Sequence, residues 1–386
     1  MHILEIPSFF TPYGGEFCLE QAKALKALGH EVRILSNVQL GMTIGGKDYM
    51  VLPFTRFEHE REGITIYQTY QRGWPRMVHH NVMHWIAIVR SMFADYVQRY
   101  GKPDILHAHC AKWAGYAAMQ VCKQYDIPYV ITEHLSLMSL EDEFGKAPSD
   151  AWQIPLLKQA YQQAAMVLPV SEELVDEIAC YYGTDYRWQH LSNVIDTDFF
   201  HYAERDYRTD SPFRFCCVAD YSYRKGYDVL LDACRLLQDQ GCDIELHIAG
   251  RLTDGKVCQQ AIAERGLTQI ITHGQIDREG VRTLLYQSDA LVLASRSEVQ
   301  PLVLLEAMST GIPVIGTECT PQNQRIAGGC TVVPIDDVEA LAAAMQHVAQ
   351  ERNTDGKAIS GAVKRMASPK VVGQQLVNLF NGIIVW

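Results

Sequence analysis

Short β-rich apolar runs alternate with helical patterns along almost the whole chain of 386 residues. In the first half, the predicted strands are His2 to Ile6, Glu31 to Ser36, Asp104 to Ala108, Tyr129 to Thr132 and Met166 to Val170. In the second half, they are Arg214 to Ala219, Glu245 to Ala249, Ala290 to Ala294, Pro313 to Ile315 and Thr331 to Pro334. Alternating strands and helices form βαβ units with a parallel sheet covered on both faces. The sequence therefore predicts an α/β protein with two doubly wound halves.

The apolar periodicity lapses in one polar, charge-dense segment, Asp198 to Pro212. We expect the boundary between the halves there, with an N-terminal domain over residues 1–200 and a C-terminal domain over residues 201–367. The final stretch, residues 368–386, carries a helical pattern through Val371, Leu376 and Phe380. It is predicted to pack back on the body of the protein.

Charge and cysteine content limit the class of protein further. The formal net charge is −11, which argues against a general nucleic-acid binder. The 11 cysteines show no metal-like spacing, so a reducing, cytoplasmic location is expected rather than a disulfide framework. The N-terminus reads as a first strand and not as a signal peptide. No apolar run approaches the roughly 18 to 20 residues of a membrane-spanning helix.

Two glycine-containing turns follow predicted strands and precede predicted helices. Gly14-Gly15 opens a helix that begins near Glu16, and Arg224-Lys225-Gly226 precedes a helix of the second half. Glycine lets the backbone approach an anion, and the N–H groups of a helix start favour a phosphate. Gly14-Gly15 is either part of a phosphate site or a plain tight turn. Arg224-Lys225-Gly226 is either part of a phosphate site or a solvated helix start.

Two glutamates bracket the start of an apolar helix in the second half. Glu298 lies in the preceding loop, and Glu306 lies inside the otherwise apolar run from Leu302 to Met308. Carboxylates accept paired hydrogen bonds from sugar hydroxyls. Because ligands bind beyond the carboxyl ends of parallel strands, both glutamates are candidates for a sugar-binding site.

These motifs make the chain resemble glycosyltransferase family 4, a group of retaining enzymes that use nucleotide sugars. The matching segments are Gly14-Gly15, Asp104 to His109, Thr132 to His134, Ser192 to Phe200, Arg224 to Gly226, and Glu298 with Glu306 to Val314. The resemblance covers most of the chain. It implies the GT-B architecture, in which two Rossmann-like domains face each other across a cleft, the first binding the acceptor and the second the donor.

The resemblance also implies roles for individual residues. His134, Glu298 and Lys225 would be catalytic, with Lys225 at the donor diphosphate and His134 at the sugar. The donor would be bound by Gly14, Gly15, Arg224, Lys225, Gly274, Gln300, Leu302, Val303 and Glu306. His109 and Glu133 would lie on the acceptor side. We expect no metal or other cofactor, because fixed cations and helix-start N–H groups can stabilise the diphosphate as it leaves.

The resemblance implies that the acceptor hydroxyl attacks the anomeric carbon from the same face from which the leaving group departs. A phosphate oxygen then takes the proton of the hydroxyl. The alternative is a double displacement through Glu298, by analogy with retaining hydrolases. Two departures from the family pattern leave the donor sugar open. Many members have Gly-Arg where this chain has Ala219-Asp220, and Val299 stands where glycine is frequent.

Two groups of residues look like metal ligands. Asp196-Thr197-Asp198 resembles an acidic metal motif, but it falls in the segment between the predicted domains. His107 and His109 alternate on one predicted strand next to Cys110. His109 could touch substrate, be a packed structural residue, or contribute to a zinc site, which needs three or four converging ligands.

The segment 71–102 has five basic residues against a single acidic one, Asp95, in an otherwise acidic chain. Trp74, Trp85 and other apolar residues are interleaved with them. This pattern fits a peripheral contact with anionic lipid on the inner face of the membrane, or with a lipid diphosphate. It also fits an ordinary helix whose core face is formed by Ile86, Val89 and Phe93.

The sequence therefore predicts a metal-independent retaining glycosyltransferase, of the hexosyltransferase type, with a role in polysaccharide biosynthesis. It would move a sugar from a nucleoside diphosphate sugar to a glycan, lipid-linked or small-molecule acceptor. One alternative is a GT-B epimerase or hydrolase acting on nucleotide sugars. Another is a sugar-binding protein without turnover.

Overall fold

The computed structural model describes residues 1–10, 14–41, 46–52, 55–146, 151–204, 212–352 and 354–384. The chain divides into two compact units, which we describe separately. Unit 1 contains residues 1–194 together with 369–386, and unit 2 contains residues 195–368. The sequence-based boundaries were drawn after residues 200 and 367. The C-terminal segment, residues 369–386, belongs to the same unit as the N-terminus.

Unit 1 is built around a seven-stranded sheet with the strand order β3-β4-β2-β1-β5-β6-β7. Its strands are β1 His2–Pro7, β2 Glu31–Leu40, β3 Phe57–Arg61, β4 Ile64–Arg72, β5 Ile105–His109, β6 Tyr129–Glu133 and β7 Met166–Pro169. The edge strand β3 pairs antiparallel with β4, and the other pairs are parallel. From β1, the chain forms β2 on one side and later β5 on the other side, so the sheet extends in both directions and is doubly wound.

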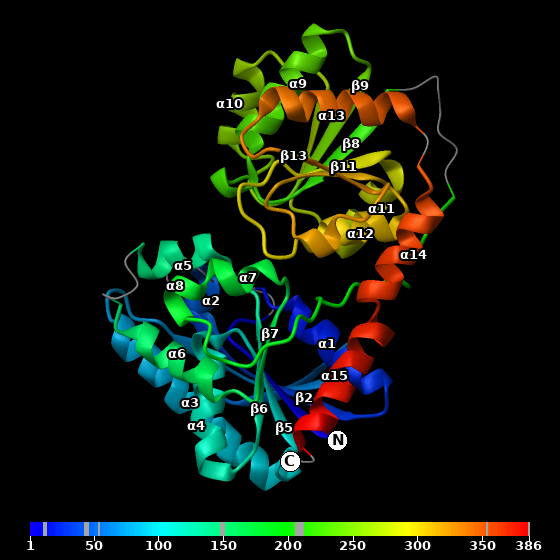
Figure 1. Cartoon of the computed structure of the whole chain (residues 1–386). Helices are drawn as coiled ribbons and strands as arrows, with labels where there is room; N and C mark the ends of the chain where they lie inside the picture. The colour runs from blue at the N-terminus through cyan, green and yellow to red at the C-terminus, as the bar shows by residue number, and fades with distance from the viewer. Residues whose placement is uncertain are drawn as a thin grey trace. The chain divides into compact units, whose positions relative to one another are not determined.

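Helices cover both faces of this sheet. The helical segments are α1 Glu16–Ala27, α2 Gly46–Val51, α3 Val78–Tyr100, η1 Ala111–Gly115, α4 Tyr116–Tyr125, α5 Leu137–Phe144, α6 Gln153–Gln163, α7 Glu173–Glu177, α8 Ala179–Tyr182 and α15 Pro369–Ile384. In Figure 1, α1 and α15 lie together on one side of the sheet, and α3, α4 and α6 lie on the other. Strands β1 and β5 are therefore buried between two helical layers.

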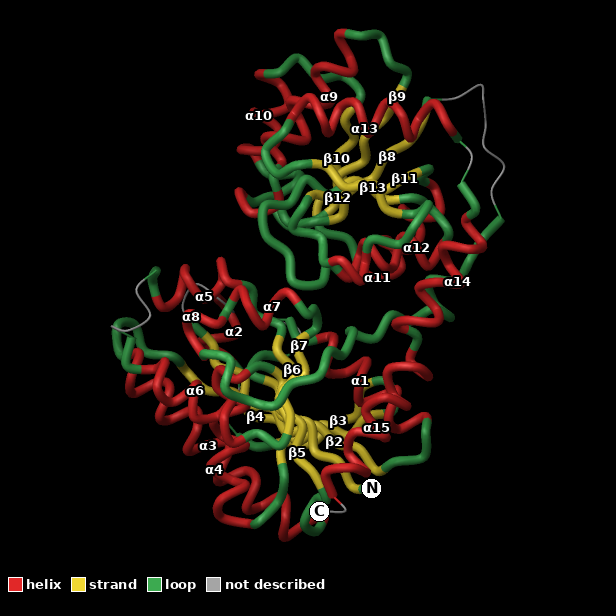
Figure 2. The backbone as a smooth tube through the Cα atoms, in the orientation of Figure 1, coloured by secondary structure: helices red, strands yellow, loops and turns green. Residues whose placement is uncertain are grey.

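Unit 2 is built around a six-stranded, fully parallel sheet with the order β10-β9-β8-β11-β12-β13. Its strands are β8 Phe213–Val218, β9 Ile244–Ala249, β10 Ile270–Gly274, β11 Ala290–Val292, β12 Val314–Thr317 and β13 Cys330–Val333. Numbered along the unit, this is the order 3-2-1-4-5-6 of the Rossmann fold. Figure 2 shows the strands of each unit enclosed by helices.

The helical segments of unit 2 are η3 Tyr223–Lys225, α9 Tyr227–Asp239, α10 Lys256–Glu264, α11 Arg278–Gln287, α12 Leu302–Thr310, η4 Gln322–Gln324, α13 Val338–Glu351 and α14 Gly356–Ala367. Helix α9 packs on α10 and α13, and α12 packs on α11 and α14. These two groups cover opposite faces of the sheet (Figure 1). The predicted α/β class with two doubly wound halves is confirmed.

Three strands were missing from the sequence-based prediction, and each has a physical reason. The edge strand β3 alternates charged residues with half-buried ones, and the edge strand β10 is half-exposed. Strand β4 is rich in polar residues although most of it is buried. Edge strands bury less apolar surface, so their apolar pattern is weak.

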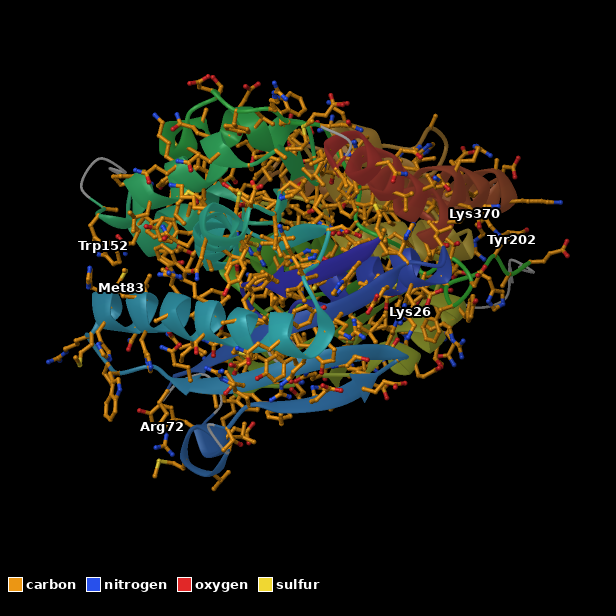
Figure 3. The ribbon with its side chains drawn as sticks, turned by 90° about the horizontal axis from the view of Figure 1, so that it is seen from below. Lys26, Arg72, Met83, Trp152, Tyr202 and Lys370 are labelled. Atoms are coloured by element: carbon orange, nitrogen blue, oxygen red, sulfur yellow. The ribbon has the colours of Figure 1, made fainter. Side chains whose placement is uncertain are left out.

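Helix α3 settles one of the alternatives for segment 71–102. Ile86, Val89 and Phe93 are buried, as is Trp85, so this helix has an ordinary core face. Figure 3 shows α3 from below, with Met83 on its exposed side near its first turns. Among the described residues, no helix combines the length and the apolar character that crossing a membrane requires.

Candidate functional site

The carboxyl ends of β8 and β11 form the point in unit 2 where the strand order reverses. Strands β9 and β10 lie on one side of β8, and β11 to β13 lie on the other. Ligands of open α/β sheets bind in the crevice at such a switch point. The loop after β8 carries Arg224 and Lys225, and the loop after β11 carries Glu298. The fold therefore brings the two strongest motifs of the sequence to one place.

Gly226 allows these two loops to approach each other closely. It has a φ of 63°, and a Cβ atom added to it would lie 1.9 Å from the carbonyl oxygen of Ala294, in the loop after β11. Only glycine fits such a contact without displacing the backbone. Gly226 is also the residue at the start of α9, where no side chain caps the helix.

Lys225 and Glu298 form a partly buried ion pair across the two loops. The Lys225 Nζ atom lies 2.5 Å from Oε1 of Glu298, and their side chains are 16% and 8% exposed. The hydroxyl of Ser295 donates a second hydrogen bond to the same oxygen, at 2.7 Å. This group joins a cation and a carboxylate at the switch point of unit 2.

Arg296 holds the Glu298 loop against the Lys225 turn. Its guanidinium donates to the carbonyl of Tyr223, to both carboxylate oxygens of Asp228 and to Asp336, at distances of 2.6 to 2.9 Å. Its backbone N–H donates to the carbonyl of Arg224 at 2.8 Å. The arginine is thus a structural clamp, and this role was not foreseen from the sequence.

Asp220, which departs from the family pattern, is paired with Arg251. The Asp220 carboxylate accepts bonds from the backbone N–H, Nε and Nη2 of Arg251, at 2.6 to 2.9 Å. Partial burial raises the pKa of the Asp220 carboxyl, but the bonds from Arg251 outweigh it and lower the pKa. The loop after β9 therefore supplies an arginine beside the place where the family often has one.

Helix α12 begins directly after the Glu298 loop. Gln300 is buried, and Leu302, Val303 and Glu306 are partly buried along the helix. Residue Pro301 precedes the helix, and no side chain caps its first turn. The predicted donor residues of this segment thus share one loop and the helix that follows it.

Gly274 lies at the end of β10, with a φ of 66°. Its carbonyl accepts a hydrogen bond from the N–H of Gly250 at 2.8 Å, which ties it to the loop after β9. A Cβ atom at Gly274 would lie 2.7 Å from the Asp254 carboxylate. Its contact with a nucleotide base stays a prediction.

Unit 1 has its own switch point between β1 and β5, and the first turn of α1 lies there. Gly15 has a φ of 86°, and a Cβ atom would lie 2.3 Å from the carbonyl oxygen of Phe9. Gly14 has a φ of 105°. The Phe17 ring of α1 stacks on the His134 imidazole, with ring centroids 3.7 Å apart. The predicted residues Gly14, Gly15 and His134 are therefore neighbours in this unit.

Glu133 uses both carboxylate oxygens inside the protein. Oε1 accepts from the backbone N–H groups of His134 and Leu135, and Oε2 accepts from the N–H of Ala111 and the hydroxyl of Tyr161, at 2.6 to 3.0 Å. The side chain is buried. It joins the loops after β5 and β6 and fixes the backbone of His134, while its predicted contact with an acceptor stays a prediction.

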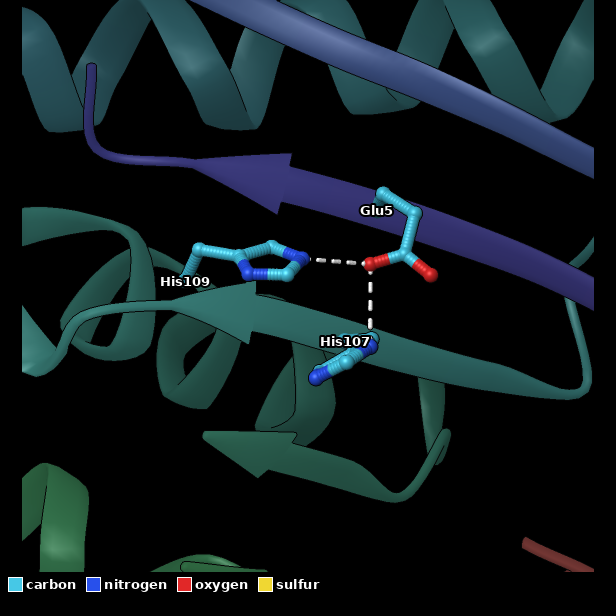
Figure 4. A group of neighbouring side chains, drawn as sticks. All are labelled: Glu5, His107 and His109. Carbon is cyan, nitrogen blue, oxygen red and sulfur yellow. Dashed lines mark hydrogen bonds and ion pairs between the residues drawn. The ribbon is translucent and has the colours of Figure 1, made fainter. Parts of the chain in front are cut away.

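Under α1 and α15 lies a buried group of one carboxylate and two imidazoles, drawn in Figure 4. Oε2 of Glu5 lies 2.7 Å from Nε2 of His109 and 2.9 Å from Nδ1 of His107. The hydroxyl of Thr132 lies 2.7 Å from the other nitrogen of His107. Nδ1 of His109 lies 3.4 Å from Nε2 of His134. His109 is fully buried, and His134 is half-buried.

The environment decides the charges in this group. Burial raises the pKa of the Glu5 carboxyl, but the two histidines outweigh it and lower the pKa to about 2. Burial lowers the pKa of His109 to about 4, and it lowers the pKa of His134 well below its usual value. At neutral pH, His109 and His134 are therefore neutral beside an ionised Glu5.

The structure also bears on the two metal-like motifs. Among the described residues, only Glu5, His107 and His109 bring three possible ligand atoms within 4.8 Å of one another. The contact of 2.7 Å between His109 and the Glu5 carboxylate is a hydrogen bond, and the contact of 2.9 Å from Nδ1 of His107 is an ion-pair distance without hydrogen-bond geometry. Asp196 accepts from the N–H of Phe199 and pairs with Arg278.

Several residues at these sites were missed from the sequence, most clearly Glu5. A carboxylate in the middle of the apolar run His2 to Ile6 was a usable signal, because a buried charge needs partners. The roles of Phe17, Ser295 and Tyr161 had no comparable signal. They depend on contacts between segments far apart in the sequence.

Comparisons with known proteins agree with this arrangement. A model described as Glycosyltransferase Family 4 matches residues 14–199, and one described as Glycosyl transferases group 1 matches residues 212–351. The chain is 29% identical over 333 residues to TuaC of Bacillus subtilis, a glycosyltransferase assigned by its name to teichuronic acid biosynthesis. That alignment covers 81% of this chain and 78% of TuaC.

Solved structures share the fold at lower identity. Sucrose-phosphate synthase from Thermosynechococcus elongatus has a TM-score of 0.80 at 17% identity, with complete coverage of both chains. Anabaena HepE in complex with UDP and glucose has a TM-score of 0.73 at 15% identity, covering 99% of this chain and 100% of that chain.

The two doubly wound units, with the motifs at their switch points, define a glycosyltransferase of the GT-B type. The two model matches together cover most of the chain, and the chain belongs to the group 1, family 4 glycosyltransferases.

Proposed function

We propose that this chain is a retaining, metal-independent hexosyltransferase. It would transfer the sugar of a nucleoside diphosphate sugar to a glycan or lipid-linked acceptor. The observation that carries the proposal is the group formed by Lys225, Glu298 and Ser295 at the switch point of unit 2. The similarity to TuaC, by its name a glycosyltransferase of teichuronic acid biosynthesis, supports a glycan product.

The donor diphosphate would lie at the start of α9. Lys225 supplies a mobile point charge there, and the first N–H groups of α9 have no side-chain cap. Arg224 adjoins Lys225 as a second cation. Glu306, inside α12, would accept hydrogen bonds from the ribose hydroxyls. The contacts of His134 and the Gly14-Gly15 turn with a donor stay predictions from the family resemblance.

The proposed reaction breaks the bond between the anomeric carbon and the phosphate oxygen. The acceptor hydroxyl attacks from the same face, and a phosphate oxygen takes its proton. Oε1 of Glu298 already accepts bonds from Lys225 and Ser295, which reduces its ability to act as a nucleophile. This favours attack on the front face over a double displacement through Glu298.

Metal independence rests on the protein's own cations. One further negative charge develops on the diphosphate as it leaves, and Lys225 with Arg224 and the α9 start can stabilise it in the transition state. A preorganised cation does the work that a divalent metal performs in other sugar transferases. We therefore expect activity without added metal.

A surface near the start of α3 would meet the membrane that carries a lipid-linked acceptor. We call the exposed residues Trp74, Met77, Val78, Met83 and Trp152 the α3 patch. Trp152 contacts the ring of His79, with centroids 4.6 Å apart, which joins it to α3. The exposed Arg76 lies within the patch segment, so apolar side chains and positive charge occur together, as in interfacial segments.

The test begins with calorimetric titration of the full chain with UDP-, GDP- and ADP-glucose. Glu306→Gln is expected to weaken binding of the preferred donor about tenfold or more, because it removes charge-assisted hydrogen bonds. Lys225→Met is expected to lower kcat by about 10²- to 10³-fold, as loss of a transition-state donor does. Glu339→Gln, at an exposed position in the first turn of α13, is the matched control and should change neither.

The product and the metal requirement complete the test. NMR of the glycoside should show the anomeric configuration of the donor, and activity should persist in EDTA. Unchanged affinity of Glu306→Gln would remove Glu306 from the donor site. Activity lost in EDTA and restored by Mn²⁺ would contradict metal independence. Release of free epimerised sugar without an acceptor would indicate an epimerase instead.

A further inference from the structure

The buried group around Glu5 connects to the one predicted catalytic residue of unit 1. Glu5 contacts His109, and His109 contacts His134, so a chain of hydrogen bonds leads from the centre of the sheet to the half-buried imidazole. Glu5 lies on β1, and His109 lies on the neighbouring strand β5. The mechanism proposed above makes no use of this chain.

The charges and distances fix the position of each proton. An ionised carboxylate only accepts hydrogen bonds, so the His109 nitrogen that faces Glu5, Nε2, must carry its proton. Because a neutral imidazole has one N–H, Nδ1 of His109 is then an acceptor. Nδ1 faces Nε2 of His134, which must therefore be the protonated nitrogen of that ring.

We propose that Glu5 and His109 are positioning residues that hold His134 in the tautomer with its proton on Nε2. Nδ1 of His134 is left as a hydrogen-bond acceptor. Among the described residues, this nitrogen has no hydrogen-bond partner, and the His134 side chain is partly exposed. The acceptor nitrogen would take a hydrogen bond from a hydroxyl of the transferred sugar, and this last step rests on the proposed function.

Packing supports a fixed His134 ring. Phe17 stacks on it at an interplanar angle of 22°, and His109 lies parallel to it within 18°. Glu133 fixes the backbone N–H of the same residue at 2.9 Å. The ring therefore has one orientation, and only its proton remains to be specified, which the chain from Glu5 does.

Glu5→Leu tests the relay with a side chain of similar size. Leucine accepts no hydrogen bond, so the single carboxylate oxygen that faces both histidines is lost. Nothing then holds the proton of His109 on Nε2. We expect His109 and His134 to become mixtures of tautomers and kcat to fall about tenfold, the equivalent of one hydrogen bond. The dissociation constant of the donor should change less than kcat.

Thr132→Val is the matched control. It removes the hydroxyl that lies 2.7 Å from His107 in the same buried group, but it is not on the path to His134. We expect a loss of stability without a change in the His134 tautomer or in kcat. A purely structural role of Glu5 would make both variants alike in stability and leave the tautomers unchanged in both.

The readout is a long-range ¹⁵N–¹H correlation spectrum of the full chain labelled at histidine, recorded at pH 7. The wild-type spectrum alone decides the first point even if the Glu5→Leu variant does not fold. A His134 protonated on Nδ1, or one stoichiometric metal ion bound by the wild type, would overturn the relay. An unchanged His134 tautomer in folded Glu5→Leu would do the same. A wild type that binds no nucleotide sugar would contradict the proposed function but would not affect the tautomer assignment.

Discussion

Glu5 shows how a single residue can set the chemistry around it. It is fully buried, and its Oε1 atom has no hydrogen-bond partner among the described residues, so its charge acts through Oε2 on two histidines. The unfolded chain would protonate His109 and Glu5 at higher pH than the folded chain does, because both pKa values are lowered in the fold.

This gives a prediction for stability against pH. Between about pH 6.5 and pH 4, the unfolded state binds more protons at His109 than the folded state, so stability falls as the pH falls through this window. Glu5 adds a further loss between about pH 4.5 and pH 2. The contribution of His109 is on the order of 3 kcal/mol, at about 1.4 kcal/mol per pKa unit.

Urea unfolding followed at several pH values between 7.5 and 5 measures this slope. His109→Gln keeps a donor toward Glu5 but does not titrate, so the slope should become shallower. The exposed His347, replaced by Gln, is the control and should leave the slope as in the wild type. An equal slope in the His109 variant and the wild type would count against the buried neutral histidine.

At the scale of the element, α15 completes the fold of unit 1. Val372, Leu376 and Phe380 are buried along one face of this helix, at the spacing of one helix turn. Gly373 lies so close to α1 that a Cβ atom would be 3.0 Å from Leu28 and 3.2 Å from the carbonyl of Ala24. The Phe380 ring meets the His107 imidazole edge-on, so α15 covers the buried group.

Phe380→Ala should therefore destabilise unit 1 by about 3 to 5 kcal/mol, the usual cost of such a cavity. Tryptophan occurs only within residues 74–188 and at position 386, so its fluorescence during urea unfolding reports on unit 1. Gln375→Ala, on the exposed side of the helix, is the matched control. Equal unfolding midpoints for the two variants would contradict the packing of α15.

At the scale of the whole molecule, the net charge is negative, whereas the segment 71–102 is locally positive. The chain carries −11 overall, which by itself would repel an anionic membrane. The basic residues of segment 71–102 are divided in their roles. Arg90 and Lys102 bond to protein acceptors, and Arg99 lies over the Tyr67 ring. Membrane contact would thus depend on the α3 patch and Arg76.

Flotation with vesicles containing anionic phosphatidylglycerol tests this contact. The wild type should float with the vesicles, and the double variant Trp74→Ala, Met77→Ala should lose at least about tenfold in binding, since each removes a large exposed apolar side chain. Val257→Ala removes a more exposed apolar side chain from unit 2 and serves as the control. Equal binding of the double variant and the control would rule out the α3 patch.

Much of the fold followed from the sequence, because periodicity reports directly on burial. Strand β1 and helix α1 begin within one residue of their predicted positions, and the same is true of β8. The turn Arg224 to Gly226 and the loop with Glu298 could be recognised because cations, carboxylates and glycines are rare inside apolar patterns. What such a motif could not show was which distant residue each side chain would meet.

The sequence by itself determined the α/β class, the two doubly wound halves and the family. Local patterns of apolar, polar and glycine residues contain that information. Only the tertiary structure decided that Lys225 pairs with Glu298, that Asp220 pairs with Arg251, and that Glu5 lies beside His109. These contacts join residues on different strands and loops, and their geometry depends on strand order and register, which no local pattern specifies.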